Sequence, residues 1–221
     1  MIPLPTQMID RWRPERPQLP PGQGHLYWHV LLGDNPAVQE LAAEAHARLG
    51  DHPGLHFTPQ RWLHMTVLMA GETREITDQQ REVMTSEAGG LLADTGPINV
   101  SLSRILYHPE AIVLALDPAE ALNPLRDAIS TAAHTALGFD VAAGQLWFPH
   151  ITLAYSTADQ PANPIITTLG HELPRRELTI DGLTLVDQVG REHDWDWRPL
   201  AELPLTSPGM AEYVERGGQA S

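Results

Sequence analysis

Hydrophobic and polar positions form two kinds of pattern along the chain, and each predicts a different element. Helices are predicted over residues 36–49, 75–92 and 117–137, the first from apolar positions that recur every three or four residues. Short apolar runs bounded by Gly, Pro or Asp are typical of strands, and they cover residues 25–32, 62–70, 98–106, 111–116, 147–155, 178–187 and 197–205. The segment 51–60, with two prolines, is predicted to be a loop.

The order strand, helix, loop, strand occurs twice. From Pro36, at the start of the first helix, to His64 is 28 residues, and from Pro118 to His150 is 32 residues. The two histidines therefore occupy equivalent places, which indicates an internal duplication. Strands joined by hairpins, with helices between them, predict an α+β fold built on antiparallel sheets.

The domain is predicted to span residues 24–205. Six prolines fall within the first 21 residues, and because proline resists helix and lacks a backbone donor, residues 1–23 are predicted to form an extended arm. Residues 206–221 are predicted to be a flexible tail. No apolar run reaches the length of a signal sequence or a transmembrane helix, so we expect a soluble, cytoplasmic protein. The net negative charge disfavours anionic membranes as partners, and we expect a monomer.

Charge and composition exclude several classes of function. All 14 basic residues are Arg, against 28 acidic residues, and the net charge of −14 disfavours long duplex nucleic acids. Without Lys there is no Schiff base or P-loop lysine, and without Cys there is no disulfide, thiolate nucleophile or Cys-based metal site.

Two apolar strands share the pattern His-x-Thr-aliphatic, as HMTV at residues 64–67 and HITL at residues 150–153. Residues i and i+2 of a strand point to the same face, so each His and its Thr project together. A third copy, His56-Phe57-Thr58, is followed by Pro59 and is discounted because it falls in the predicted loop.

Two imidazoles and two hydroxyls in one groove favour phosphodiester chemistry without a metal. One histidine can act as general base and the other as general acid, which predicts a rate optimum around pH 6–8. Two alternatives remain open. The histidines can be core residues satisfied by backbone acceptors, or they can bind zinc, which needs a third ligand at a spacing that the sequence does not offer.

The HMTV and HITL segments, within WLHMTV and FPHITLAYS, resemble the 2H phosphoesterase superfamily, specifically its bacterial 2′-5′ RNA ligase-like (cyclic nucleotide phosphodiesterase) branch. The resemblance covers residues 24–205 and implies two pseudo-symmetric lobes with antiparallel sheets around a central groove. It implies that His64 and His150 are catalytic and that Thr66 and Thr152 hold the phosphate oxygens. No cofactor and no metal is implied.

Five further residues are predicted to contact substrate, because they follow, flank or face the motifs: Tyr155, Tyr27, His29, Arg61 and Trp147. The alternatives are that the face carrying Tyr27 and His29 meets solvent and that the flanking residues pack or are solvated. Family members often carry Arg shortly after the second motif, where this chain has Tyr155, so an anion contact is missing or is supplied elsewhere.

The resemblance implies an enzyme that hydrolyses a 2′,3′-cyclic phosphate or a 2′-5′ phosphodiester. The acidic surface favours small nucleotides or RNA ends over long strands. The alternatives are a 2′-5′ RNA ligase and a nucleotide-binding module without turnover.

Overall fold

The computed structural model describes residues 3–13, 20, 22–50, 52–144, 146–190, 193 and 196–206. Its helices are α1 Pro36–Leu49, α2 Asp78–Leu92, α3 Asn123–Leu137 and α4 Ala162–Leu169, with short 3₁₀ turns at Gln60–Trp62, Thr73–Glu75 and Ala119–Leu122. Its strands are β1 Gln7–Met8, β2 Gly24–Leu31, β3 Leu55–Phe57, β4 His64–Glu72, β5 Ile98–His108, β6 Ala111–Asp117, β7 His150–Ser156, β8 Gln160–Pro161, β9 Glu172–Ile180, β10 Gly182–Val189 and β11 Asp196–Pro204.

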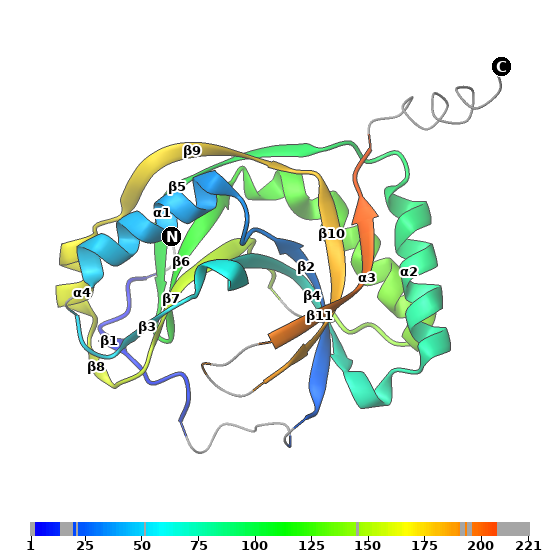
Figure 1. The fold of residues 1–221 in the computed structure, drawn as a ribbon, viewed down its shortest axis with the longest axis horizontal. Coiled ribbons are helices and arrows are strands. Elements are labelled where there is room, and N and C mark those ends of the chain that lie inside the picture. The colour runs from blue at the N-terminus through cyan, green and yellow to red at the C-terminus, as the bar shows by residue number, and fades with distance from the viewer. Residues whose placement is uncertain are drawn as a thin grey trace.

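One antiparallel sheet organises the described residues, in the strand order β11-β10-β2-β4-β7-β6-β5-β9, with β3 paired to β7 off this path (Figure 1). The predicted α+β fold with antiparallel strands is confirmed. The two predicted sheets are joined into one, because β4 of the first half pairs with β7 of the second. Along these two fully described strands, Met65 of β4 and Ile151 of β7 form the one residue pair, and the strands separate on either side of it. We call this pair the joint between the two halves of the sheet.

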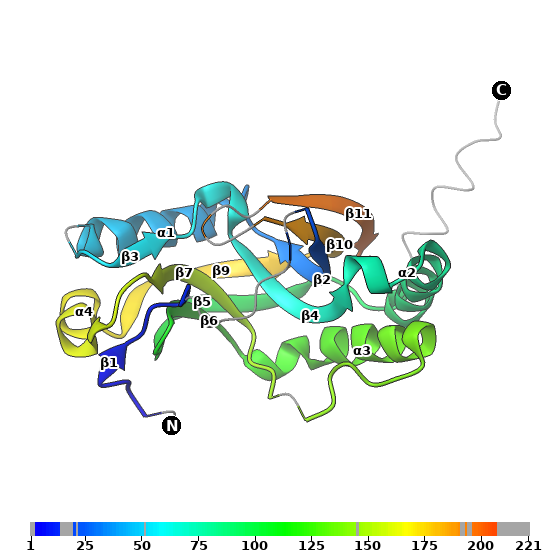
Figure 2. The same ribbon diagram turned by 90° about the horizontal axis from the view of Figure 1, so that it is seen from below.

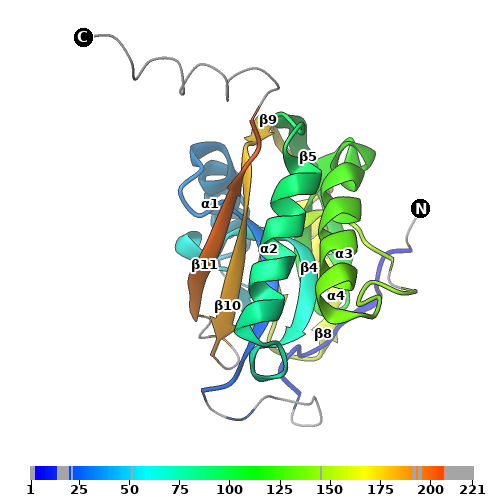
Figure 3. The ribbon, with the colours of Figure 1, turned by 90° about the vertical axis from the view of Figure 1, so that its right-hand side faces the viewer.

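The helices that follow the inner strands cross over to the opposite half. Helix α1, from the first half, packs against β9 and α4, while α3, from the second half, packs against β4 and α2. Figure 2 shows α1 and α4 at one end of the molecule and α2 and α3 at the other, and Figure 3 shows α2 and α3 side by side. Each half of the sheet is therefore covered in part by a helix from the other half.

Local sequence signals set the helix starts. Asn35 caps α1, with its side-chain oxygen accepting the Val38 N–H at 3.2 Å, and Pro36 follows as predicted. The third helix begins at Asn123 rather than at residue 117, because Pro118 opens only a 3₁₀ turn and Pro124 lies in the first helical turn. From Pro124 to His150 is 26 residues, close to the 28 of the first half.

Two predicted segments are wrong. The predicted strand 178–187 is two strands, because the chain breaks at Asp181 and β9 joins the second half of the sheet while β10 joins the first. The predicted loop 51–60 contains β3, where His56 pairs with Tyr155 of β7, so the third His-x-Thr copy begins on a strand and its Thr58 follows the strand's end. Helix α4 was not predicted.

The described part of the N-terminal segment packs on the domain that was predicted to begin at residue 24. Strand β1 pairs with β8, and the Met8 side chain is fully buried in the core. The Ile9 N–H donates to the Pro109 carbonyl at 2.8 Å. Residues 3–13 thus comprise the short strand β1 and a turn at residues 11–12, and they pack against the rest of the domain. The predicted tail lies outside the described residues except for Thr206.

Candidate active site

The joint between β4 and β7 fixes the arrangement of the two motifs. Because Met65 and Ile151 pair in antiparallel register, His64 lies across from Thr152 and Thr66 lies across from His150. Met65 and Ile151 are fully buried on the opposite face of the sheet. The four polar side chains therefore form a quadrilateral in which histidines and threonines alternate at the corners, related by an approximate two-fold axis through the joint.

Both motif histidines are oriented by the same local bond. His64 Nδ1 lies 2.7 Å from the Trp62 carbonyl oxygen, and His150 Nδ1 lies 2.8 Å from the Phe148 carbonyl oxygen. A carbonyl oxygen only accepts, so Nδ1 carries the proton and donates in each case. The nitrogen left for a ligand is Nε2 in both rings, which is an acceptor when the ring is neutral.

Burial holds both rings in the neutral form. It lowers the pKa of His64 to about 4, with a further lowering from His150 and an opposing contribution from the Trp62 carbonyl. Burial also lowers the pKa of His150, helped by His108 and opposed by the Phe148 carbonyl. Burial therefore lowers the pKa of both histidines below the value of an exposed histidine on which the expected optimum of pH 6–8 rested.

The quadrilateral lines a cavity of about 190 Å³. Seven of the nine predicted site residues line it, namely His64, Thr66, His150, Thr152, Tyr155, Tyr27 and His29. Tyr27 and His29 come from β2, whose opposite face carries the buried Leu26 and Trp28, so the predicted alternation of this strand is confirmed. The polar face of β2 meets the cavity rather than open solvent.

A third histidine lies against the first motif. The rings of His29 and His64 have centroids 4.3 Å apart, and His29 stacks on Tyr27 at 5.0 Å. His29 is fully buried, its Nε2 lies 3.3 Å from Gln188 Oε1, and burial lowers its pKa well below the usual range. His29 Nδ1 is buried without a hydrogen-bond partner.

Arg61 and Trp147 are not among the residues that line this cavity. The Arg61 guanidinium lies over the Trp62 ring, 4.8 Å from its centroid, and Arg61 is exposed. The Trp147 indole Nε1–H donates to the Thr66 carbonyl at 3.0 Å. Trp147 therefore ties the segment before β7 to β4 next to the motif, and its contact is with the backbone of Thr66.

Two cavity residues, Arg11 and Gln188, were not predicted. Arg11 lies in the proline-rich segment that was placed outside the domain, and Gln188 lies one residue beyond the predicted strand 178–187. The signal for Gln188 is its place on β10, where it pairs with His25 of β2. For Arg11 the one sequence signal is that Tyr155 stands where family members often carry an arginine. In the structure the Arg11 guanidinium lies 4.7 Å from the centroid of the Tyr155 ring.

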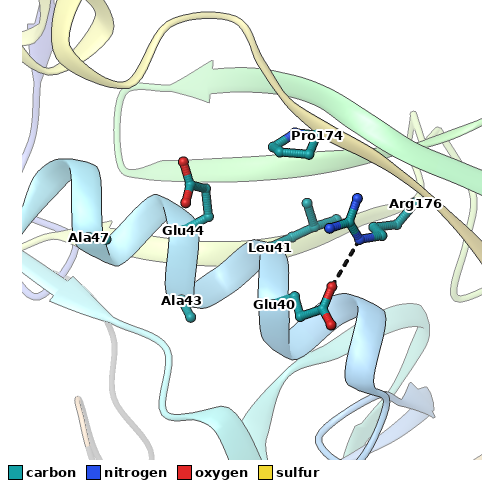
Figure 4. Close-up of a pocket in the computed structure, with 7 residues that line it drawn as sticks. All are labelled: Glu40, Leu41, Ala43, Glu44, Ala47, Pro174 and Arg176. Atoms are coloured by element: carbon teal, nitrogen blue, oxygen red, sulfur yellow. Dashed lines mark hydrogen bonds and ion pairs between the residues drawn. The ribbon is translucent and has the colours of Figure 1, made fainter.

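The rest of the described chain has a second depression but no metal-binding cluster and no membrane-spanning helix. A larger, more open depression between α1 and β9 is lined by Glu40, Glu44 and Arg176, with Arg176 Nε donating to Glu40 Oε2 at 2.9 Å (Figure 4). No group of three or more His, Asp or Glu side chains within the described ranges has an arrangement that could hold a metal ion. Among the helices described, none has the length and apolar character needed to span a membrane.

Solved structures share this fold over most of the chain. Escherichia coli LigT complexed with 3′-AMP superposes with a TM-score of 0.65 at 17% identity, covering 84% of this chain and 99% of that one. The protein TT0787 of Thermus thermophilus gives a TM-score of 0.65 at 19% identity, covering 83% and 99%. The MHV ns2 PDE domain gives 0.53 at 14% identity, covering 74% and 98%. These identities are low, so the likeness shows the fold.

Sequence comparison assigns the family. No curated protein matches the chain. A family model described as the 2′-5′ RNA ligase superfamily matches residues 33–192, which include both His-x-Thr motifs. This match covers well over half of the chain, and the chain belongs to the 2′-5′ RNA ligase superfamily.

Proposed function

We propose that this protein hydrolyses 2′,3′-cyclic phosphates of small nucleotides or RNA ends, with His64 and His150 as its acid–base pair. The observation that carries the proposal is the alternating quadrilateral of two histidines and two threonines at one cavity, with both imidazoles oriented by backbone carbonyls. Such a site offers two proton-transferring groups on opposite sides of one phosphorus atom.

The two histidines differ in environment, which suggests their roles. His64 has its pKa lowered to about 4 and is neutral at pH 7, as a general base must be. In this mechanism His64 Nε2 takes a proton from water, whose oxygen attacks phosphorus, and His150 gives a proton to the ribose oxygen as its bond to phosphorus breaks. A bound phosphate anion favours the protonated form of His150, because an opposite charge nearby raises a histidine pKa.

Thr66 and Thr152 supply hydroxyl donors for the non-bridging phosphate oxygens. Donors already in place stabilise negative charge that develops in the transition state, without reorganisation of solvent. In this scheme hydroxyl and imidazole groups perform every step, so the proposed reaction is independent of metal.

Cavity size and charge support a small substrate. A volume of about 190 Å³ suits a phosphate with its ribose better than a long strand. The net charge of −14 also opposes binding to long nucleic acids, for which neutralisation of backbone phosphates is a main source of affinity. LigT has been crystallised with 3′-AMP, and also with ATP and with NADP+, so a protein of this fold holds nucleotides. These features favour hydrolysis over ligation of two RNA ends.

Product analysis with four candidate substrates tests the proposal: a purine and a pyrimidine 2′,3′-cyclic nucleotide, a 2′-5′ dinucleotide and a cyclic-phosphate-ended RNA. We expect His64→Asn and His150→Asn each to lower turnover by about 10²–10⁴-fold. Asparagine keeps a donor near the Nδ1 position but removes Nε2, so the bond to the backbone carbonyl can persist.

A matched control is His134→Asn, which changes an exposed histidine on α3 and is expected to keep wild-type turnover. Thr66→Val and Thr152→Val are expected to cost less than the histidine variants. Wild-type turnover in the His64→Asn/His150→Asn double variant would contradict the assignment. Turnover of the dinucleotide without turnover of the cyclic nucleotides would show that the substrate bond is a 2′-5′ linkage and not a 2′,3′-cyclic phosphate.

A further inference from the structure

One residue that lines the active-site cavity comes from outside the large sheet. Arg11 follows β1 in the N-terminal segment, and its backbone N–H donates to the Ser156 carbonyl at 2.9 Å, at the end of β7. The pairing of β1 with β8 and the fully buried Met8 side chain fix the segment just before it. Arg11 is therefore held beside the second motif strand by backbone bonds.

The residues around Arg11 hold this part of the segment in place. Trp12 packs edge-on against Tyr155, with ring centroids 5.6 Å apart, and the Trp12 N–H donates to Asp10 Oδ1 at 2.9 Å. Arg13 Nη2 lies 2.8 Å from Asp159 Oδ1. These contacts place Arg11 and Arg13 on the same segment, yet Arg13 is not among the residues that line the cavity.

The Arg11 side chain lies where the cavity meets β7. Its guanidinium is 4.7 Å from the centroid of the Tyr155 ring, and its Nη1 lies 3.1 Å from Glu110 Oε2. Tyr155 lines the same cavity, three residues after Thr152 on the strand. The planar guanidinium carries five N–H donors in a fork that matches the oxygens of a phosphate.

Charge at the cavity singles out Arg11. Among the described residues that line the cavity, Arg11 is the one permanent cation and none is a carboxylate. Burial favours the neutral forms of His64 and His150 by lowering the pKa of each. The cation that an anionic ligand meets there is Arg11, whose guanidinium also pairs with Glu110, on a chain of net charge −14.

The depression between α1 and β9 differs from the active-site cavity in the charged side chains that line it. That depression also has an arginine, Arg176, but Glu40 and Glu44 line it as well, so its lining has a net negative charge (Figure 4). Both carboxylates are ion-paired, Glu40 with Arg176 and Glu44 with Arg48, so no arginine in that lining is without a carboxylate beside it. At the active-site cavity the carboxylate that pairs with Arg11, Glu110, is not part of the lining.

We infer that Arg11 binds the substrate's phosphate group, so that the N-terminal segment supplies one residue of the active site. The inference rests on the proposed function for the identity of the ligand as a nucleotide phosphate. It adds a charged contact from a different part of the chain to the uncharged donors Thr66 and Thr152.

The test measures binding and turnover separately in Arg11→Ala, Arg11→Lys and the control Arg13→Ala. The probe for binding is 3′-AMP, titrated calorimetrically, and the substrate is a 2′,3′-cyclic nucleotide. We expect Arg11→Ala to weaken 3′-AMP binding by about 10- to 100-fold, the usual effect of losing a charge-assisted hydrogen bond. Arg11→Lys should recover part of this loss, because it keeps the charge but not the fork.

Arg13→Ala removes a positive charge and an ion pair from the same segment and should bind 3′-AMP as the wild type does. Thermal unfolding of each variant separates a lost contact from a lost fold. Wild-type affinity and turnover in a folded Arg11→Ala variant would overturn the inference and leave the proposed function standing. Binding that depends on Arg11 in a wild type that hydrolyses none of the substrates would overturn the proposed function instead. An equal loss in Arg13→Ala would show a general charge effect and refute a specific contact.

Discussion

The buried state of His64 predicts a measurable dependence of stability on pH. Its pKa is about 4 in the folded protein, against 6.5 for an exposed histidine. Between these values the unfolded chain binds a proton that the folded protein excludes, so acidification favours unfolding. The contribution of neutral His64 is complete above pH 6.5, is lost as the pH falls toward 4, and stays lost below that.

The size of the effect follows from the shift. A shift of about 2.5 units corresponds to roughly 3 kcal/mol in total, of which about 2 kcal/mol is lost between pH 7 and pH 5. The perturbation that isolates it is His64→Asn, which keeps a donor for the Trp62 carbonyl but does not titrate in this range. Carboxylates and the other histidines are present in both proteins, so their contributions to the pH dependence of the unfolding free energy largely cancel when the two proteins are compared.

The assay is urea unfolding followed by circular dichroism at pH 7 and pH 5 for both proteins. On acidification the wild type should lose about 2 kcal/mol more unfolding free energy than His64→Asn, a midpoint difference of about 1 M urea at a typical slope. His134→Asn, which changes an exposed side chain, should follow the wild type. Equal losses in wild type and His64→Asn, within about 0.5 kcal/mol, would refute the reasoning, because they would mean that His64 is protonated as easily in the folded protein as in the unfolded chain.

Three other predictions concern activity and a fourth concerns packing. Because burial lowers the pKa of both His64 and His150, kcat/KM, which reports the free enzyme, should peak below pH 6.5. Bound phosphate raises the pKa of both histidines, so kcat should peak at a higher pH than kcat/KM. A kcat/KM maximum near pH 8 would contradict this. Hydrolysis should persist in EDTA, and activity that is lost on chelation and restored by a divalent ion would contradict the proposed metal-free steps. Catalytic efficiency on a 2′,3′-cyclic mononucleotide should equal or exceed that on an RNA of about 20 nucleotides with the same end, so a strongly salt-sensitive preference for the RNA would point to a basic track. Trp147→Phe should destabilise the protein by about 1 kcal/mol in urea unfolding, because it leaves the Thr66 carbonyl without its indole donor, and an unchanged midpoint would speak against this contact.

Sequence reasoning works well for features set by alternation along one strand. The His-x-Thr spacing predicts that His64 and Thr66 share a face, and the alternation of residues 25–32 predicts that Tyr27 and His29 lie opposite Trp28. Both follow from the two-residue period of a strand, and the structure brings these side chains to one cavity. Their chemical roles remain proposals.

Features that depend on distant parts of the chain were not predictable in this way. Asp181-Gly182 is a dipeptide typical of turns, and the apolar alternation changes phase across it, from Leu178 and Ile180 to Leu183 and Leu185. What nothing local marks is that the chain there leaves one half of the sheet for the other. Arg11 sits among prolines that predict an arm, and what brings it to the site is the burial of Met8 and the backbone bond to Ser156. These are tertiary contacts between segments more than a hundred residues apart.

The crossed helices have a consequence for how the chain folds. Arg48 of α1 donates to the carbonyls of Leu169 and Glu172, and these residues are synthesised more than a hundred positions later. A ribosome-bound first half therefore exposes the β4 surface that α3 covers and the α1 surface that β9 and α4 cover. Such separated contacts slow folding and leave the nascent chain open to aggregation until most of it has emerged. Although the order of strands and helices is duplicated, we expect neither half to fold alone, because each leaves an apolar surface that the other half covers.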